Sequence, residues 1–354
     1  MLIPHTLTVL MTNTCTARCA HCCMNSSPER KGSLNAATVI KAINDLHNRS
    51  PLSMIVFAGG EPTLEKRALD ASLRHCVTLG IPTRLVTNAS WARTSAAAQR
   101  TLARLRRAGL NELNISADDY HLPFIPFTNV INAWRAAREM DFQAIVIANS
   151  HGPGSRITPE FIRAQLGEDV PLRFDEDGND RTCFDDTSDA TYLSISNAKV
   201  QRLERAEVEL TEQAFGLLSD DASLDTPCPH AVQSAALSPR GHLLSCCGFE
   251  LDGNEVLDFG DVRLQSANNL VDKANDDMIV GAIAYFGPMF LKRFVKVVAP
   301  EVVFPERYGS VCEVCRSVVK NPEAVKALRD NFRRLGPMVL QRRMQVNNSG
   351  TQTA

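Results

Sequence analysis

The sequence predicts an α/β fold with a parallel sheet, followed by a smaller second module, and three observations support this prediction. Residues 6–176 alternate short apolar or β-branched runs with longer amphipathic stretches, which is the pattern of repeated β-α units. The chain has 354 residues, more than one compact core usually holds. Its cysteines gather mainly in two groups, one near the N-terminus and one after residue 227, which indicates a second functional module.

Six short runs are expected to form the strands, because an amphipathic stretch or a turn signal bounds each of them. They are residues 7–11, 54–59, 83–88, 112–117, 144–149 and 171–175. Asn35 can cap one intervening helix, Gly109 can end another, and Thr158 and Gly167 can frame a third. Parallel strands joined by helices place functional loops at the carboxyl ends of the strands, so a site is expected at that edge.

Composition argues against several classes of protein. Hydrophobic residues make up 44% of the chain and charged residues 22%, with a formal net charge of −2, so the chain should fold and offers no basic surface for nucleic acid or membrane. The longest apolar stretch, residues 278–291, is short and contains Pro288, which predicts a buried helix and turn instead of a membrane span. Without a signal-peptide pattern, a cytoplasmic location is expected.

The chain is expected to divide into five segments. These are a barrel core at 1–180, a connector at 181–227, the second module at 228–320, a helix at 321–345 and a disordered tail at 346–354.

Eleven cysteines in a chain without an export signal indicate metal ligation, redox chemistry or burial, because the cytosol keeps thiols reduced. Cys15, Cys19 and Cys22 follow the first expected strand with the spacing C-x3-C-x2-C. Three thiolates leave one iron of a four-iron cluster open to a further ligand. A zinc knuckle or unrelated buried thiols is the alternative.

This spacing resembles the signature of the radical S-adenosylmethionine (radical SAM) superfamily, in which an aromatic residue usually occupies the position held here by His21. The resemblance covers residues 6 to about 176 and implies a partial (β/α)6 barrel of the TIM type. It also implies a 4Fe–4S cluster with an open site and bound S-adenosylmethionine. Cys23 falls outside the signature and has no assigned role.

Later segments resemble the cofactor-binding strand ends of the same family. The family's GGEP segment, which holds the methionine amino group, corresponds here to Gly59, Gly60, Glu61 and Pro62. The resemblance further implies a polar contact from Asn88 and ribose contacts from Ser116 and Asp118. Each of these short segments can also be read as an ordinary turn.

The second group of cysteines is expected to form a second site. Cys228 and Cys246 flank a hairpin expected to turn at residues 239–241, and Cys312 and Cys315 form a C-x2-C pair. By spacing alone, four such thiols suit zinc or a cluster about equally. The arrangement resembles the twitch type of the SPASM/twitch extension, which implies one auxiliary 4Fe–4S cluster; the role of Cys247 stays open.

Residues beyond the fourth and sixth strands are candidates for substrate contact. They are Asp119, Tyr120, His121 and Arg173, each of which can also be an ordinary loop or strand-end residue. Cys183 belongs to neither group and is a candidate hydrogen-atom donor or an inert thiol, and Cys76 is expected in the core.

The resemblance implies a radical SAM oxidoreductase that cleaves S-adenosylmethionine reductively and takes hydrogen from a C–H bond of a peptide, with net oxidation or crosslinking. The alternatives are dehydrogenation of a small sugar or aminocyclitol, radical epimerisation with Cys183 as hydrogen donor, and a non-catalytic zinc-binding protein. Expected partners are a flavodoxin- or ferredoxin-type electron donor and, for a peptide substrate, a separate peptide-presenting protein. Neither nucleic acid nor membrane is expected as a partner.

Overall fold

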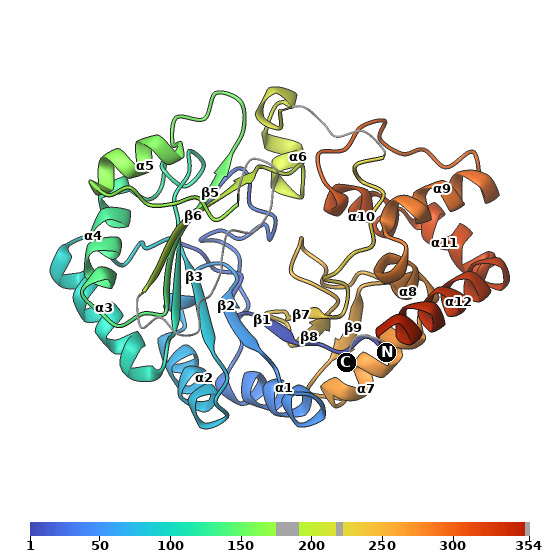
Figure 1. Cartoon of the computed structure of the whole chain (residues 1–354), viewed down its shortest axis with the longest axis horizontal. Helices are drawn as coiled ribbons and strands as arrows, with labels where there is room; N and C mark the ends of the chain where they lie inside the picture. The colour runs from blue at the N-terminus through green and yellow to red at the C-terminus, as the bar shows by residue number, and fades with distance from the viewer. Residues whose placement is uncertain (175–190, 217–221, 351–354) are drawn as a thin grey trace.

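The computed structural model describes residues 1–174, 191–216 and 222–350, and its central feature is one nine-stranded sheet with the order β6-β5-β4-β3-β2-β1-β7-β8-β9. The six strands β1 to β6 are parallel, and helices cover the outer face of this curved part of the sheet (Figure 1). The strands are β1 (Thr6–Leu10), β2 (Met54–Ala58), β3 (Thr83–Thr87), β4 (Glu112–Ser116), β5 (Ala144–His151) and β6 (Tyr192–Lys199). The helices are α1 (Ala36–Arg49), α2 (Lys66–Thr78), α3 (Ser95–Ala108), α4 (Phe127–Arg138) and α5 (Pro159–Leu166). The predicted partial barrel of six β-α units is confirmed.

The ends of these helices follow the capping residues in the sequence. The side chain of Asn35 accepts a hydrogen bond from the Thr38 backbone N at the start of α1, and Thr158 caps α5 in the same way. Gly109 ends α3 and Gly167 ends α5, both with positive φ, a conformation that glycine adopts without strain. Local chemistry therefore sets the lengths of the helices around the barrel.

The sixth strand does not lie where the sequence predicted it. Instead of residues 171–175, β6 occupies Tyr192–Lys199, inside the segment expected to be a connector, and pairs with β5 along its whole length. Leu172 forms only an isolated bridge with Ile195. The prediction failed because β6 is an edge strand with several polar residues, whereas the other strands of the barrel are short apolar runs.

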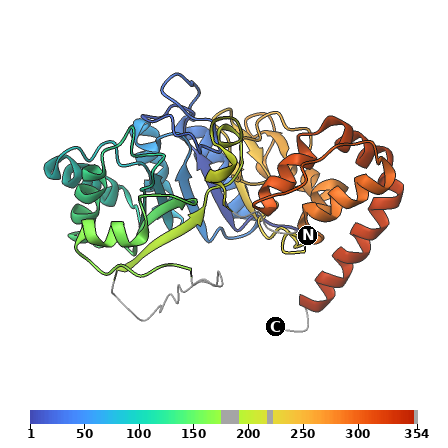
Figure 2. The ribbon, with the colours of Figure 1, turned by 90° about the horizontal axis from the view of Figure 1, so that it is seen from above.

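The second half of the chain extends the same sheet on the far side of β1. Strand β7 (Ser234–Leu237) pairs in parallel with β1, and β8 (His242–Leu244) and β9 (Asp258–Asp261) continue the sheet antiparallel. The predicted hairpin at residues 239–241 is therefore confirmed as the β7–β8 turn. Figure 2 shows the barrel and the C-terminal helices side by side, with the chain around α6 (Arg205–Glu209) between them.

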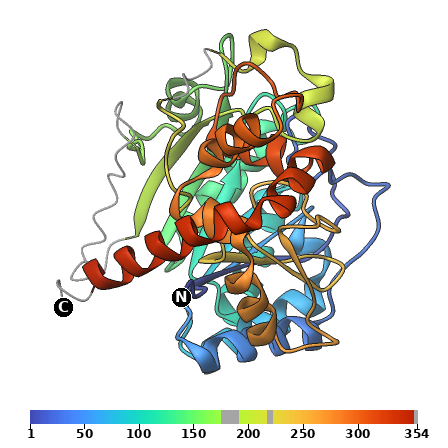
Figure 3. The ribbon, with the colours of Figure 1, turned by 90° about the vertical axis from the view of Figure 1, so that its right-hand side faces the viewer.

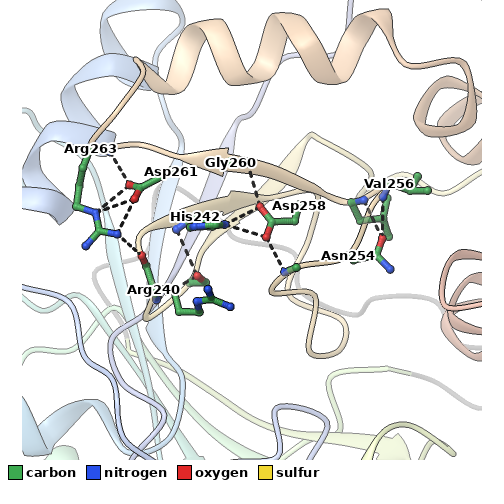
Figure 4. Close-up of polar contacts among 11 residues, drawn as sticks. Arg240, His242, Asn254, Val256, Asp258, Gly260, Asp261 and Arg263 are labelled. Atoms are coloured by element: carbon green, nitrogen blue, oxygen red, sulfur yellow. Dashed lines mark hydrogen bonds and ion pairs between the residues drawn. The ribbon is translucent and has the colours of Figure 1, made fainter.

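Polar contacts join β8, β9 and the loop between them (Figure 4). His242 Nδ1 lies 2.9 Å from Asp258 Oδ2, and this carboxylate also accepts hydrogen bonds from the backbone N of Gly253 and Gly260. Arg263 pairs with Asp261 and donates to the carbonyl oxygen of Arg240 in the hairpin turn. These contacts fix the loop that follows β8, and with it the residues around Cys246.

Helices complete the C-terminal half. They are α7 (Ala267–Asp276), α8 (Met278–Tyr285), α9 (Pro288–Val298), α10 (Val311–Val319), α11 (Pro322–Asp330) and α12 (Phe332–Gly350), with two short 3-10 helices at Pro62–Leu64 and Glu212–Ala214 elsewhere in the chain. The apolar stretch at 278–291 forms the buried helix α8, a turn at Gly287 and the first residues of α9, as predicted. None of the helices that the structure describes is long and apolar enough to cross a bilayer.

Two expectations about the C-terminus are wrong. The expected single helix at 321–345 is two helices, α11 and α12, and α12 continues to Gly350 through part of the tail that was expected to be disordered. Figure 3 shows α12 crossing this side of the molecule, where it packs against α8. The buried residues Leu335 and Val339 lie in the first half of α12, whereas Met344 and Val346 further along it are exposed.

Candidate active site

A cavity of about 310 Å³ opens at the carboxyl ends of the barrel strands, and we call it the site cavity. Its lining includes the three cysteines of the N-terminal group, Cys15, Cys19 and Cys22. Other lining residues come from the ends of β2, β3 and β4, from the chain after β6 and from the loop after β8, and they include Gly59, Gly60, Asn88, Ser116, His121, Gln201 and Gly248. The parallel sheet thus brings residues distant in sequence to the edge where the strand pattern predicted a site.

Residues 12–27, the cluster loop, pack directly on the loop that follows β2. The backbone N of Gly60 donates to the carbonyl oxygen of Thr12 at 2.6 Å, and the backbone N of Glu61 donates to that of Thr14 at 3.0 Å. A Cβ atom on Gly60 would lie only 2.1 Å from the Thr14 carbonyl oxygen. The glycines are therefore required by the close approach of two backbones that together form the wall of the cavity.

A buried arginine from α6 holds the other side of the cluster loop. Arg205 is 8% exposed and donates from Nη1 to the carbonyl oxygen of Cys19 at 3.0 Å and from Nη2 to that of Ser26 at 2.8 Å. These carbonyl groups lie on either side of Cys22, so one guanidinium group fixes the segment between them. Arg205 could not be predicted from the sequence, because its segment carries no recognisable motif.

The three thiols of the cluster loop suit a metal centre with one ligand missing. Burial is the main cause that raises the pKa of Cys15 to about 12, and the charges of Glu61, Cys19 and Cys22 act in the same direction. The hydrogen bond from the Ala17 backbone lowers the pKa but is outweighed. The thiol is therefore protonated when no metal is bound. Iron bound to the sulfur would displace that proton. Asn88 Nδ2 lies 3.5 Å from Cys15 Sγ, which places an amide donor beside this ligand.

Glu61 does not face the site cavity. It is fully buried, and its carboxylate accepts hydrogen bonds from Thr63, from the hydroxyl of Thr87 at 2.9 Å and from the backbone N of Asn88 at 2.9 Å. These contacts join the ends of β2 and β3, and the expected contact of Glu61 with an ammonium group stays a prediction. Pro62 begins the short 3-10 helix that follows.

Asp118 is buried next to two histidines, and its expected contact with a ribose stays a prediction. Its side chain is 1% exposed and lies against two histidines: His121 Nδ1 is 2.9 Å from both carboxylate oxygens, and His21 Nε2 is 3.4 Å from Oδ2. These histidines hold the pKa of Asp118 far below its usual range despite its burial, and the carboxylate raises the pKa of His121. Ser116 lines the cavity as expected.

The candidate substrate contacts separate into different places. His121 lines the cavity and Tyr120 stacks on His21, with ring centroids 4.7 Å apart. Asp119 accepts hydrogen bonds from the backbone N of Arg156 and Ile157, which ties the loop after β5 to the end of β4.

Arg173 is not brought to the cavity; it follows α5 and stacks on Phe174, with the guanidinium carbon 5.2 Å from the ring centroid. Cys183 lies outside the described residues, and Cys76 is fully buried in α2, which confirms its expected place in the core.

The second group of cysteines does come together. Burial raises the pKa of Cys315, and the charges of three neighbouring thiols raise it further. These thiols are Cys246, Cys312 and Cys228, so the four cysteines lie close together. The Sγ atoms of Cys246 and Cys312 lie 3.7 and 3.6 Å from the Cβ position of Gly248, where the chain comes close to both. Four convergent thiols without a disulfide among the described cysteines fit a fully ligated metal centre.

Two thiols outside both ligand sets lie between them. Burial, followed by the charges of Cys22, Cys247 and Cys312, raises the pKa of Cys23. Cys23 also lines the site cavity, and Cys247 directly follows the ligand candidate Cys246. The two cysteine groups are therefore neighbours in space, which no spacing in the sequence indicated.

Comparison with known proteins agrees with the resemblance of the cysteine-lined site to the radical SAM superfamily. Residues 9–153 match the family model described as Radical SAM superfamily, and this range contains the three cysteines, the glycines and the strand ends that form the cavity. Across most of its length, the chain is similar to a Bacillus subtilis (strain 168) protein named "Putative peptide biosynthesis protein YydG". The two are 21% identical over 328 residues, which is 90% of this chain and 93% of the relative.

Solved structures with a similar arrangement include anSMEcpe with bound AdoMet and the Cp18Cys peptide. It is 12% identical, with a TM-score of 0.46, over 96% of this chain and 98% of that one. Streptococcus suis SuiB bound to S-adenosylmethionine is 16% identical, with a TM-score of 0.43, over 80% and 68% of the two chains. BtrN in complex with AdoMet and 2-DOIA is 13% identical, with a TM-score of 0.44, over 77% and 83%.

Proposed function

We propose that this radical SAM enzyme takes a hydrogen atom from a C–H bond of a peptide substrate, with an auxiliary cluster as a partner in electron transfer. The main support for this proposal is that Cys15, Cys19 and Cys22 line one cavity together with the ends of β2, β3 and β4. Three sulfur ligands leave one iron of a four-iron cluster free for S-adenosylmethionine. When bound, the cluster and S-adenosylmethionine together would supply a 5′-deoxyadenosyl radical.

The residues of the chain then bind, orient and shield the reactants. Gly59, Gly60, Asn88 and Ser116 line the cavity and are the candidates for contacts with S-adenosylmethionine. Glu61 accepts a hydrogen bond from the backbone N of Asn88 and so fixes that residue, and Arg205 fixes the cluster loop. Such buried supporting contacts hold a reactive centre in place and limit the access of water.

The second metal centre would be held by Cys228, Cys246, Cys312 and Cys315. With four thiolate ligands it has no open position, so its chemistry is electron transfer. Cys23 of the cluster loop lies near Cys247 and Cys312, so the second centre is close to the cluster loop. This placement favours exchange of electrons with a substrate radical in the cavity. This arrangement supports a net oxidation, such as a dehydrogenation or a crosslink.

A peptide is the substrate class that the comparisons favour. The similar protein of Bacillus subtilis carries the name of a peptide biosynthesis protein, and the similarity extends over nearly the whole of both chains. A small sugar or aminocyclitol is the alternative substrate. The two are separated by incubating the anaerobically reconstituted enzyme with S-adenosylmethionine, a reductant and a peptide encoded beside its gene, followed by mass spectrometry.

Metal and activity measurements test the class of enzyme. The reconstituted protein should hold about eight irons per chain, and replacing Cys15, Cys19 and Cys22 by Ala should leave about four and abolish 5′-deoxyadenosine formation. Cys76→Ala is the matched control, since this thiol lies in the core away from both groups. A colourless protein that binds zinc and leaves S-adenosylmethionine intact would establish the zinc-binding alternative instead.

Radical epimerisation of the peptide is the second candidate, and the position of Cys23 favours it. A thiol that lines the site cavity outside both ligand sets can give its hydrogen atom to a substrate radical, a role for which Cys183 was the candidate from the sequence. The thiyl radical left on Cys23 would then take up one electron from the reductant and one proton from water. Epimerisation in deuterated water replaces one carbon-bound hydrogen of the peptide by deuterium, whereas oxidation removes two hydrogen atoms. Retention of deuterium incorporation in Cys23→Ala would exclude Cys23 as the donor.

A further inference from the structure

We propose that an extended stretch of the peptide substrate pairs with the outer edge of β6 at Asn197 and Lys199, as an added strand of the barrel sheet. This inference rests on the proposed function, because it requires a peptide substrate, and it names the surface that holds the main chain of that peptide. In such pairing, backbone hydrogen bonds hold the ligand and neighbouring pockets select its side chains.

Strand β6 is the last strand of the sheet on the side of the barrel, so only the edge that faces β5 is paired along its whole length. In an extended strand, the backbone groups of successive residues point alternately to the two edges. The backbone N of Tyr192 donates to the carbonyl oxygen of Gln143, and that of Val200 donates to His151, so the even-numbered residues face β5. The odd-numbered residues of β6 therefore face the outer edge.

A segment of this chain already pairs with one part of the outer edge. The backbone N of Ile195 donates to the carbonyl oxygen of Pro171 at 2.8 Å, and the backbone N of Arg173 donates to that of Ile195 at 2.9 Å. Leu172 thereby forms an isolated parallel bridge with Ile195. The outer edge of β6 thus has the geometry to pair with a further extended segment.

The outer edge has no such partner further along the strand. The backbone groups of Asn197 and Lys199 make no hydrogen bond with any residue that the structure describes, and Ala198 and Lys199 are exposed. An exposed, unpaired strand edge is a template for another extended chain. The two outward-facing residues lie about 6.6 Å apart along the strand, which matches alternate residues of an extended peptide. This short edge suits a substrate segment better than the sheet of a second copy of the chain.

The unpaired part of the edge leads to the site cavity. The residues from the end of β6 that line this cavity are Ala198, Lys199, Val200 and Gln201. A peptide paired at Asn197 and Lys199 therefore has its neighbouring residues at the cavity, where a C–H bond has to be presented. Hydrogen bonds to the main chain would fix the position of that bond, whatever the side chains of the paired residues.

The test compares proline with alanine at the two outward-facing positions. Proline removes the backbone N–H, whereas alanine removes the same side chain and keeps the N–H. Binding is measured by isothermal titration calorimetry with the reconstituted holoenzyme, S-adenosylmethionine and a synthetic copy of the peptide encoded beside the gene, without reductant. The dissociation constant of the peptide should be about threefold to tenfold higher for Lys199→Pro than for Lys199→Ala, and likewise for Asn197→Pro against Asn197→Ala.

Stability measurements control for distortion of the strand. Ala198→Pro removes an N–H that faces β5, so it should lower the free energy of unfolding, whereas proline at 197 or 199 should be as stable as alanine there. For a proline variant that is unstable, the peptide is changed instead. An ester bond in place of one amide removes one N–H of the peptide, and such esters should weaken binding at alternate positions of the paired stretch.

Equal dissociation constants for the proline and alanine variants at both positions would overturn the inference. An ester series that weakens binding equally at neighbouring positions, or at none, would also overturn it. Failure of the proposed function gives a different result: wild-type enzyme that neither binds nor modifies the peptide, which would overturn the peptide substrate and this pairing together.

Discussion

The contact between Arg205 and the cluster loop allows a quantitative prediction for Arg205→Met. The guanidinium group makes two hydrogen bonds to backbone carbonyl groups, at 3.0 Å to Cys19 and 2.8 Å to Ser26, and the residue is 8% exposed. Hydrogen bonds from a charged donor contribute about 1.5–3 kcal/mol each, so the pair is worth about 3–6 kcal/mol. Methionine also removes the cost of burying a cation, so we expect the lower value, about 3 kcal/mol.

The loss of this stabilising free energy should mainly affect the cluster loop. If the two hydrogen bonds mainly keep the loop closed, about 3 kcal/mol corresponds to a roughly hundredfold larger population of the open loop. Iron of the N-terminal cluster should therefore pass to an external chelator up to about a hundred times faster, while the iron of the auxiliary cluster is retained. Arg205→Lys should be intermediate, because one ammonium group cannot reproduce the two parallel contacts of a guanidinium group.

The assay is the time course of iron transfer under anaerobic conditions, together with chemical denaturation of the metal-free protein. Arg18→Met is the matched control, since Arg18 joins the same loop to the same helix through Glu209 at 2.5 Å but on the exposed surface. Equal iron release from Arg205→Met and wild type, or equal effects of the Arg205 and Arg18 variants, would refute the reasoning.

Three further predictions follow from the packing and the thiols. Gly60→Ala should lower the free energy of unfolding by more than about 2 kcal/mol, measured by denaturation, because the added Cβ would lie 2.1 Å from the Thr14 carbonyl oxygen. Cys312→Ala/Cys315→Ala should lower the iron content by about four per chain and leave the N-terminal cluster in place. Burial raises the pKa of Cys76 to about 12, above about 8.5 in an unfolded chain, so its contribution to stability is complete below pH 8.5 and is lost as the pH rises toward 12. Between pH 8 and 10, the free energy of unfolding should therefore fall by about 2 kcal/mol less in Cys76→Ala than in wild type, as measured by denaturation. Identical pH profiles of the two proteins would contradict this prediction.

Much of the barrel and the site was predictable from short stretches of sequence. The caps at Asn35 and Thr158, the end of α3 at Gly109 and the first five strands depend on residues only a few positions away, so their signals are local. The same holds for the spacing of Cys15, Cys19 and Cys22, since three ligands for one centre can be supplied by a single loop. The turn between β7 and β8 was also readable from its residues.

The tertiary structure decided how remote segments meet. The pairing of β7 with β1 joins residues 6–9 to residues 234–237 and brings the second group of cysteines beside the cluster loop. Contacts between residues far apart in the chain also determine the position of β6 and the burial of Glu61. The same holds for the hydrogen bonds of Arg205 to the cluster loop. Such contacts arise only when the whole sheet and its helices pack together, so residue spacing predicted which groups could act as ligands, and packing decided which groups support them.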